Sequence, residues 1–275
     1  MTKEAARLAP MPVNRVTTED VLAVLQPLWQ TKPATAQRLR GRIERVLDAA
    51  KARDLIASPY ENPARWRGHL DHLLPRRKLL EQPHHAALPY EDVPAVLREL
   101  RARAGIGARA LELIILTAMR TNEVIGARWD EIDFKENTWT IPAARMKAGR
   151  THRVPLSRGA LAILKPLHEA RESAFVFPGR TPGSALGRKV VRWQAEHMKI
   201  DGTVHGFRSS FRDWASETTS FPHEVCEAAL AHTVGSAVER AYRRVDLFEK
   251  RRHLMEAWAE HCTTPERGKV LAFRP

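Results

Sequence analysis

The sequence predicts a mainly α fold with a small antiparallel sheet (α+β), divided into two domains. Three observations lead to this prediction. Apolar residues recur at helical spacing over most of the 275-residue chain. In the segment TWTIPAARMKAGRTHRVPLS the period changes to that of two short strands. A basic segment with four prolines, residues 75–94, interrupts the helical pattern and marks the domain boundary near residue 86.

The charge of the chain favours a polyanionic partner. Lys and Arg (45) exceed Asp and Glu (32), which gives a formal net charge of +13 and a pI near 10.3, and both halves share the excess. Two cysteines, Cys226 and Cys262, build neither a disulfide framework nor a four-cysteine zinc site. The sequence shows neither a signal peptide nor a membrane-spanning stretch. We therefore expect a cytoplasmic, nucleoid-associated bacterial protein with no membrane partner.

Two helices are expected in the first domain. Residues 17–30 begin with Thr17 and an acidic first turn, which is typical of a capped helix. In the next helix one face is apolar, with Leu39, Ile43, Val46, Leu47 and Ala50, and another is basic, with Arg38, Arg42 and Arg45. A basic face is often only a solvated surface. The charge of the whole chain favours contact of these arginines with DNA phosphates.

The second domain is expected to combine helices with a hairpin. The strands are Trp139–Pro142 and Arg153–Leu156, joined by a polar loop that carries Lys147 and Gly149, and AFVF at 174–177 is a candidate third strand. Helices are expected at 91–103, 107–119, 157–171, 184–198, 205–217, 222–231, 236–243 and 246–261. The last of these has an apolar stripe formed by Leu247, Phe248, Leu254, Met255 and Trp258. This stripe docks either on its own domain or on a neighbouring subunit.

The sequence predicts no metal site and no cofactor. HEVCE at 223–227 begins like a zincin helix, but Glu227 occupies the position of the second histidine ligand. The pairs His69 with His72 and His84 with His85 have no nearby residues that complete a ligand set. The glycine-rich segment 179–189 lacks the spacing of a phosphate-binding loop.

Several charged residues and one tyrosine are candidates for a catalytic site. Arg120 and Glu123 lie three residues apart, so that on a helix the carboxylate can hold the guanidinium. His205 and Arg208 have the same spacing, and His232 precedes Tyr242. Taken singly, each has a structural explanation: an ordinary ion pair, a buried histidine, a tyrosine at the edge of a core.

Together and in this order these residues resemble the tyrosine recombinase (phage integrase) family, most closely its prophage and satellite-phage branch. The likeness extends from about residue 14 to residue 262. It includes RIERVLDAA, NPARWRGHL, HHAALPY, WTIPAARMKAGRTHRVPLS, HGFRSSFRDWASE and LAHTVGSAVERAYRR. The sequence LAH, where much of the wider family has LGH, is usual in this branch.

The resemblance implies a role for each candidate residue. It makes Arg120 and Arg208 the two active-site arginines, Lys147 the hairpin lysine, His205 the first residue of the HxxR motif, His232 the second conserved histidine, Tyr242 the nucleophile and Glu123 the support of the first arginine. The residue types suit this chemistry, because two guanidiniums neutralise a phosphodiester without a metal. A lysine is a suitable general acid for the leaving oxygen.

The resemblance also implies a domain organisation. The expected parts are an unstructured extension (1–13), a helical core-site DNA-binding domain (14–80), a linker (81–90), a catalytic domain (87–263) and a tail (264–275). Members of this branch carry an arm-site domain and further core-binding helices before the point at which this chain begins, so an incomplete core-binding bundle is expected. The implied partners are double-stranded DNA, a homotetramer on DNA, a host DNA-bending protein and an excisionase.

The implied function is site-specific DNA recombination through a covalent 3′-phosphotyrosine intermediate, for integration or excision of a prophage or mobile element. Two alternatives stay open at this point. One is DNA relaxation of the type IB topoisomerase kind, which uses similar residues. The other is a truncated prophage remnant that binds DNA without catalysis.

Overall fold

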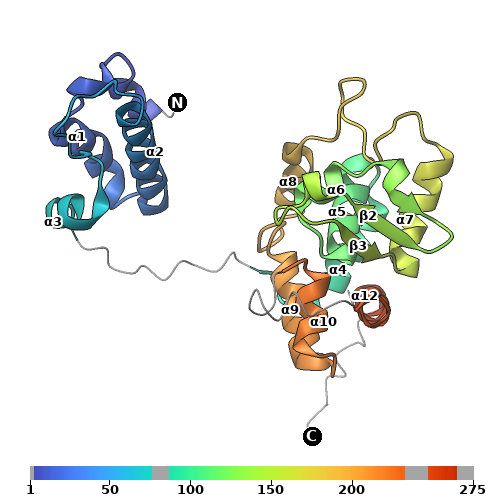
Figure 1. Cartoon of the computed structure of the whole chain (residues 1–275). Coiled ribbons are helices and arrows are strands. Elements are labelled where there is room, and N and C mark those ends of the chain that lie inside the picture. The colour runs from blue at the N-terminus through green and yellow to red at the C-terminus, as the bar shows by residue number, and fades with distance from the viewer. Residues whose placement is uncertain (1–2, 76–86, 233–246, 265–275) are drawn as a thin grey trace, which may run out of the picture. The chain divides into compact units, whose positions relative to one another are not determined.

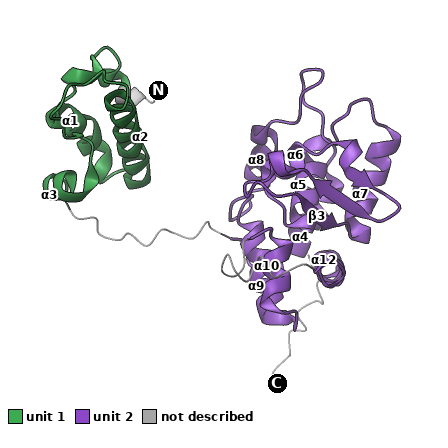
Figure 2. Cartoon of the chain, in the orientation of Figure 1, with its two compact units in different colours: residues 1–82 green, residues 83–275 purple. Residues whose placement is uncertain are grey.

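The computed structural model describes residues 3–75, 87–232 and 247–264 (Figure 1). The chain divides into two compact units, residues 1–82 and 83–275 (Figure 2), and the division falls within the proline-rich segment. Each unit has its own hydrophobic core. The expected helix at 236–243, with Tyr242, and the pair His84 and His85 lie outside the described residues.

The first unit is a small helical bundle. Its elements are η1 (Lys3–Leu8), η2 (Val13–Arg15), α1 (Thr18–Trp29), α2 (Pro33–Lys51), the helical turn η3 (Trp66–Leu70) and α3 (Asp71–Leu73). Helix α1 begins with the predicted cap: the Thr17 hydroxyl accepts from the Asp20 amide at 3.2 Å, and the Asp20 carboxylate accepts from the Thr17 amide at 3.1 Å. These two bonds satisfy amides that the helix itself leaves unpaired.

Helix α2 separates an apolar face from a basic face, as predicted. Its buried residues are Ala36, Leu39, Ile43, Leu47 and Ala50. Arg38, Arg42 and Arg45 are exposed. The assignment of Val46 to the buried face is wrong, because this side chain is 59% exposed. Val46 lies at the edge of the apolar stripe, next to the basic face.

The segment before α1 differs from the unstructured extension that the sequence led us to expect. Lys3–Leu8 forms a 3-10 helix, and Leu8 and Val13 pack against the core of the first unit. Short apolar segments of this kind have too few residues for helical periodicity to reveal them.

The second unit consists of helices and a small three-stranded sheet. Its first half contains η4 (Tyr90–Asp92), α4 (Val93–Ala102), α5 (Ile106–Thr117), α6 (Thr121–Ile125), η5 (Trp129–Glu131), β1 (Ile132–Asp133), β2 (Thr138–Ile141), η6 (Ala143–Arg145) and β3 (His152–Pro155). Its second half contains α7 (Arg158–Glu169), α8 (Arg188–His197), α9 (Phe207–Thr218), α10 (His223–Ala229) and α12 (Phe248–Thr263). Helix α8 begins four residues later than expected, because the chain makes a turn in which the Ser184 amide donates to the Thr181 carbonyl at 3.1 Å.

The predicted hairpin supplies two of the three strands of the sheet, with β2 in the middle. Strands β1, β2 and β3 are antiparallel in that order, and Ile141 of β2 is opposite His152 of β3. The third strand is β1, so the assignment of residues 174–177 to this sheet is wrong. Phe175 instead forms an isolated bridge with Arg128. The intervening turn η5 separates that bridge from β1.

Helix α12 packs against its own unit (Figure 1). Leu254, Met255 and Trp258 are buried in the core that also contains α5. The Trp258 indole donates to the Ile115 carbonyl at 2.8 Å. Of the two alternatives for this apolar stripe, docking on its own domain is correct, because the chain itself covers the stripe.

Helix α10 ends in a Schellman motif. The His232 amide donates to the Glu227 carbonyl at 3.0 Å, and the Ala231 amide donates to the Ala228 carbonyl at 3.1 Å. Ala231 has a φ of 51°, a left-handed conformation that glycine adopts easily and alanine does not. The alanine of LAH therefore carries backbone strain that a glycine would not.

No helix in the described part of the chain has the length and apolar character needed to cross a membrane.

We predict that Ala231→Gly stabilises the second unit. Glycine adopts the left-handed conformation of this position without strain. The substitution is therefore expected to raise the free energy of unfolding by roughly 1 kcal/mol, measured by urea denaturation of the full chain. Ala228→Gly is the matched control, because Ala228 lies within the helix, and there glycine is expected to destabilise by roughly 0.5–1 kcal/mol. Equal destabilisation by both variants would contradict the assignment of strain to Ala231.

Candidate active site

Arg208 is held between the carboxyl-terminal ends of two helices. The side chain is 4% exposed. Its Nη1 donates to the carbonyl of Ala118 after α5, and its Nη2 donates to the carbonyl of Leu230 after α10 at 2.7 Å. Carbonyls at these ends lack helical partners and carry the negative end of the helix dipole. The backbone therefore provides a preformed site for a buried cation.

The charge of Arg208 is maintained despite its burial. Burial, and then the positive charge of Arg120, lowers the pKa of Arg208 to about 10, while Glu123 and Glu227 act in the opposite direction. The guanidinium is thus protonated at neutral pH. Because Arg208 donates to the carbonyl of Ala118, two residues before Arg120, the two predicted arginines lie near each other.

Glu123 holds both the backbone and the side chain of Arg120. Its carboxylate accepts from the Arg120 amide at 2.9 Å and from Nη1 at 3.0 Å. Glu123 is 2% exposed. The predicted pair therefore forms, with Arg120 at the N-cap of α6 and Glu123 in the first turn.

His232 joins Arg208 through its imidazole. Its Nε2 lies 3.1 Å from Nη2 of Arg208, and its Nδ1 lies 2.8 Å from a carboxylate oxygen of Glu227. The other oxygen of Glu227 accepts from Nε of Arg212 at 2.6 Å. A continuous chain of hydrogen bonds therefore connects Arg212, Glu227, His232 and Arg208.

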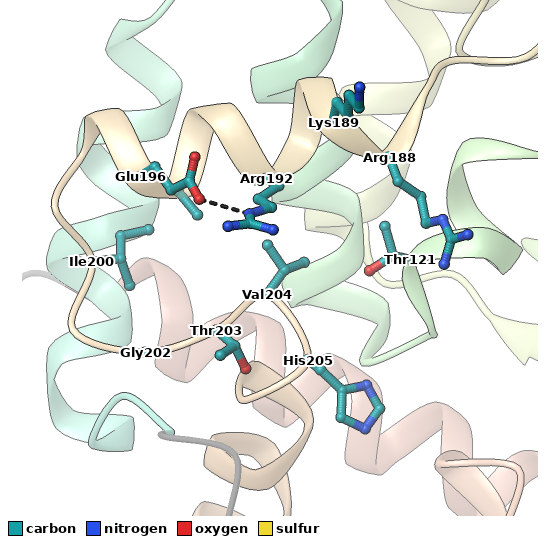
Figure 3. A pocket seen from close by; sticks show the side chains of 11 residues that line it. Thr121, Arg188, Lys189, Arg192, Glu196, Ile200, Gly202, Thr203, Val204 and His205 are labelled. Carbon is teal, nitrogen blue, oxygen red and sulfur yellow. Dashed lines mark hydrogen bonds and ion pairs between the residues drawn. The ribbon is translucent and has the colours of Figure 1, made fainter. Parts of the chain in front are cut away.

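His205 lies at the edge of a basic cavity next to these residues. Its carbonyl accepts from the Arg208 amide at 3.1 Å. The cavity has a volume of about 680 Å³, and Figure 3 shows the basic side chains of α8 across it from the His205 imidazole. The residues that line it include Thr121, Arg188, Lys189, Arg192, Glu196 and His205. Glu196 accepts from Nε of Arg192 at 2.6 Å, so the excess of positive charge in the cavity comes from Arg188 and Lys189.

Lys147 does not join this network. It is exposed on the loop between β2 and β3, and it forms no hydrogen bond or ion pair with the described residues. The start of the loop is fixed, because Arg145 donates to Glu131 at 2.8 Å. Gly149 has a φ of 63°, a conformation that glycine adopts easily and that allows the loop to turn. The lysine is thus presented to solvent from an anchored hairpin.

Two residues near the arginines were missed by the sequence analysis. One is Glu227, which we considered only as a missing zinc ligand. The other is His152 on β3, whose Nε2 is buried without a hydrogen-bond partner in the described ranges. Burial, and then the charges of Arg251, Arg120 and Arg208, lowers the pKa of His152 to about 4. Neither has a motif or spacing that points to the site.

The remaining predicted residues do not belong to the described part of the second unit. Arg38, Arg42 and Arg45 belong to the first unit, residues 1–82. Tyr242 is outside the described residues. Tyr90 has a separate environment, because its hydroxyl donates to Glu217 at 3.1 Å and this hydrogen bond raises its pKa to about 12.

The arrangement can bind an anion without a metal. Among the described residues no group of three or more histidine, cysteine or acidic side chains is arranged to hold a metal ion. Two guanidiniums that are fixed in advance by backbone carbonyls and a carboxylate stabilise negative charge with little reorganisation. Planar guanidiniums are also suited to the geometry of phosphate oxygens.

Sequence comparison identifies two regions of the chain. Residues 88–248 match the phage integrase family, and residues 2–69 match the phage integrase central domain. Prophage integrase IntA of Escherichia coli (strain K12) is 34% identical over 278 residues, which cover 96% of this chain and 63% of that protein. The chain thus spans less than two thirds of the length of this relative.

Solved structures share the fold. A lambda integrase(75-356) dimer bound to a COC' core site matches with a TM-score of 0.59 and 18% identity, over 83% of each chain. A lambda integrase tetramer bound to a Holliday junction matches with a TM-score of 0.58 and 16% identity, over 82% of this chain and 66% of that one. With more than half of its residues matched to the family model, the chain belongs to the phage integrase family of tyrosine recombinases.

Proposed function

We propose that this chain acts as a site-specific DNA recombinase that cuts and rejoins strands through a covalent 3′-phosphotyrosine at Tyr242. The observation that carries the proposal is the buried guanidinium of Arg208, which is hydrogen-bonded to His232 and to the carbonyl of Ala118, two residues before Arg120. The proposed biological role is integration or excision of a prophage or mobile element.

In this proposal the two arginines bind the scissile phosphate. A phosphodiester repels a nucleophile, and the pentacoordinate transition state concentrates further negative charge on its non-bridging oxygens. Arg120 and Arg208 compensate this charge, with Glu123 holding the first guanidinium and two carbonyls holding the second. His205, which lines the basic cavity, is the proposed acceptor of the tyrosine proton.

Strand cleavage then needs a nucleophile and an acid. The Tyr242 oxygen attacks phosphorus and gives its proton to His205, the bond between phosphorus and the 5′-oxygen breaks, and the 5′-oxygen leaves with a proton from Lys147. The segment that carries Tyr242 follows directly after His232 in the sequence. The phosphotyrosine bond retains the energy of the broken linkage, so rejoining requires no ATP.

Double-stranded DNA is the proposed substrate of both units. We assign core-site contacts to residues 14–80, with Arg38, Arg42 and Arg45, and the chemistry to residues 87–263, with residues 81–90 as linker. The family match and the basic composition support this assignment. The lambda integrase structures, a dimer on a core site and a tetramer on a Holliday junction, lead us to propose a homotetramer on DNA. A host DNA-bending protein and an excisionase are further proposed partners.

Replacement of the nucleophile is the direct test. Tyr242→Phe is expected to abolish covalent trapping on a nicked suicide duplex, because phenylalanine has no oxygen to attack phosphorus, while DNA binding changes little. Trapped complexes are measured by denaturing electrophoresis and binding by mobility shift.

Tyr90→Phe is the matched control, because it removes a tyrosine hydroxyl that is bonded to Glu217 instead. It is expected to trap DNA as the parent does. Undiminished trapping by Tyr242→Phe would overturn the assignment of the nucleophile.

The acid role of Lys147 has a separate test. Lys147→Ala is expected to slow single-turnover cleavage by roughly 10²–10⁴-fold, and a 5′-thio leaving group, which needs less protonation, is expected to restore most of the rate. Lys165→Ala, which removes an exposed lysine of α7, is the control and is expected to cleave both substrates normally. An equal defect of Lys147→Ala on both substrates would argue against the acid role.

A further inference from the structure

Glu227 has no role in the chemistry proposed above, yet it lies next to His232. Its side chain is 17% exposed, and its two oxygens have different partners: Nε of Arg212 at 2.6 Å and Nδ1 of His232 at 2.8 Å. Burial opposes ionisation, but the hydrogen bonds from Arg212 and His232 hold the pKa of Glu227 below its usual range. Glu227 is therefore a carboxylate at neutral pH.

The two partners of the imidazole determine its tautomer. An ionised carboxylate only accepts hydrogen bonds, so Nδ1 of His232 must carry the hydrogen that Glu227 accepts. A guanidinium only donates, so Nε2 must accept from Arg208. Both contacts require the Nδ1–H form, with the Nε2 lone pair directed to Arg208.

The end of helix α10 explains why these two side chains meet. His232 and Glu227 are also joined by their backbones, because the His232 amide donates to the Glu227 carbonyl at 3.0 Å in the Schellman motif. The motif brings the histidine back beside the last turn of the helix. Arg212 of α9 holds the carboxylate from the opposite side. The carboxylate is thus fixed by Arg212 of α9 and by His232, which follows α10.

We propose that Glu227 is a positioning residue that fixes the Nδ1–H tautomer and the orientation of His232, and so directs the Nε2 lone pair to Arg208, one of the two guanidiniums proposed to bind the scissile phosphate. This inference rests on the proposed function for its catalytic consequence, while the tautomer itself does not depend on activity. In the DNA-free chain Nε2 accepts from Arg208.

The tautomer is tested by nitrogen NMR of the full chain labelled with ¹⁵N in histidine. The His232 signals are assigned from the spectrum of His232→Ala. The parent is expected to show the Nδ1–H form of neutral His232. In Glu227→Ala the imidazole is no longer held and turns away from Arg208, so it is expected to shift to the Nε2–H form that free histidine prefers. The Nε2–H form in the parent, or an unchanged spectrum of Glu227→Ala, would overturn the proposal.

Arg212→Ala is the matched control. Like Glu227→Ala, it removes the contact between Arg212 and Glu227. It leaves the carboxylate next to His232, so the Nδ1–H form is expected to persist. Loss of that form in Arg212→Ala alone would show that Arg212, and not Glu227, determines the tautomer. If Glu227→Ala does not fold, Glu227→Gln takes its place. Its amide can present N–H or oxygen to Nδ1, so a mixture of tautomers is expected, and a pure Nδ1–H form would contradict the proposal.

A double-mutant cycle tests the catalytic consequence. Glu227→Ala is expected to slow single-turnover cleavage of the suicide duplex by roughly 10–100-fold, but to add no further loss in a His232→Ala background, because it acts through that histidine. An equal further loss in that background would show a merely structural role. A parent chain that shows the expected tautomer but traps no DNA would contradict the proposed function and leave the positioning of His232 by Glu227 intact.

Discussion

The burial of the Arg208 guanidinium is the constraint on which the rest of the site depends. A buried cation is costly unless acceptors surround it, and here the acceptors are backbone carbonyls that become available only where α5 and α10 end. Ala118 and Ala231, at these two ends, both have left-handed backbone conformations. Each such residue costs roughly 1–3 kcal/mol, whereas a hydrogen bond to a charged group contributes roughly 1.5–3 kcal/mol. The bonds to Arg208 thus offset the strain that exposes their acceptors.

The same arrangement explains why the site favours an anion. The positive charge of Arg120 adds to burial in lowering the pKa of Arg208, so the two guanidiniums repel each other in the DNA-free chain. A phosphate that interacts with both replaces this repulsion by attraction. Glu123 and Glu227 partly compensate the positive charge, but each also has a fixed arginine partner of its own, Arg120 and Arg212 respectively. The carboxylates therefore orient the cationic groups while the site stays open to a polyanion.

Features encoded by local pattern could be predicted from the sequence. The Thr17 cap, the basic and apolar faces of α2, the hairpin and the pair of Arg120 with Glu123 all depend on residues that are close in sequence. The wrong predictions for Val46 and for residues 174–177 also have local causes. Val46 is at the edge of a stripe, where periodicity does not decide burial. Residues 174–177 have the composition of a strand, but Phe175 forms a bridge with Arg128, which precedes the turn η5, and not with the sheet.

Contacts between distant elements could not be predicted in this way, and they determine the site. Nothing in the pattern of α12 indicates that Trp258 donates to the Ile115 carbonyl, a bond between residues far apart in the chain. Ile115 lies in the last turn of α5, and its carbonyl also accepts from the amide of Ala118, whose own carbonyl binds Arg208. The docking of α12 on its own unit therefore helps to fix the helix end that holds Arg208.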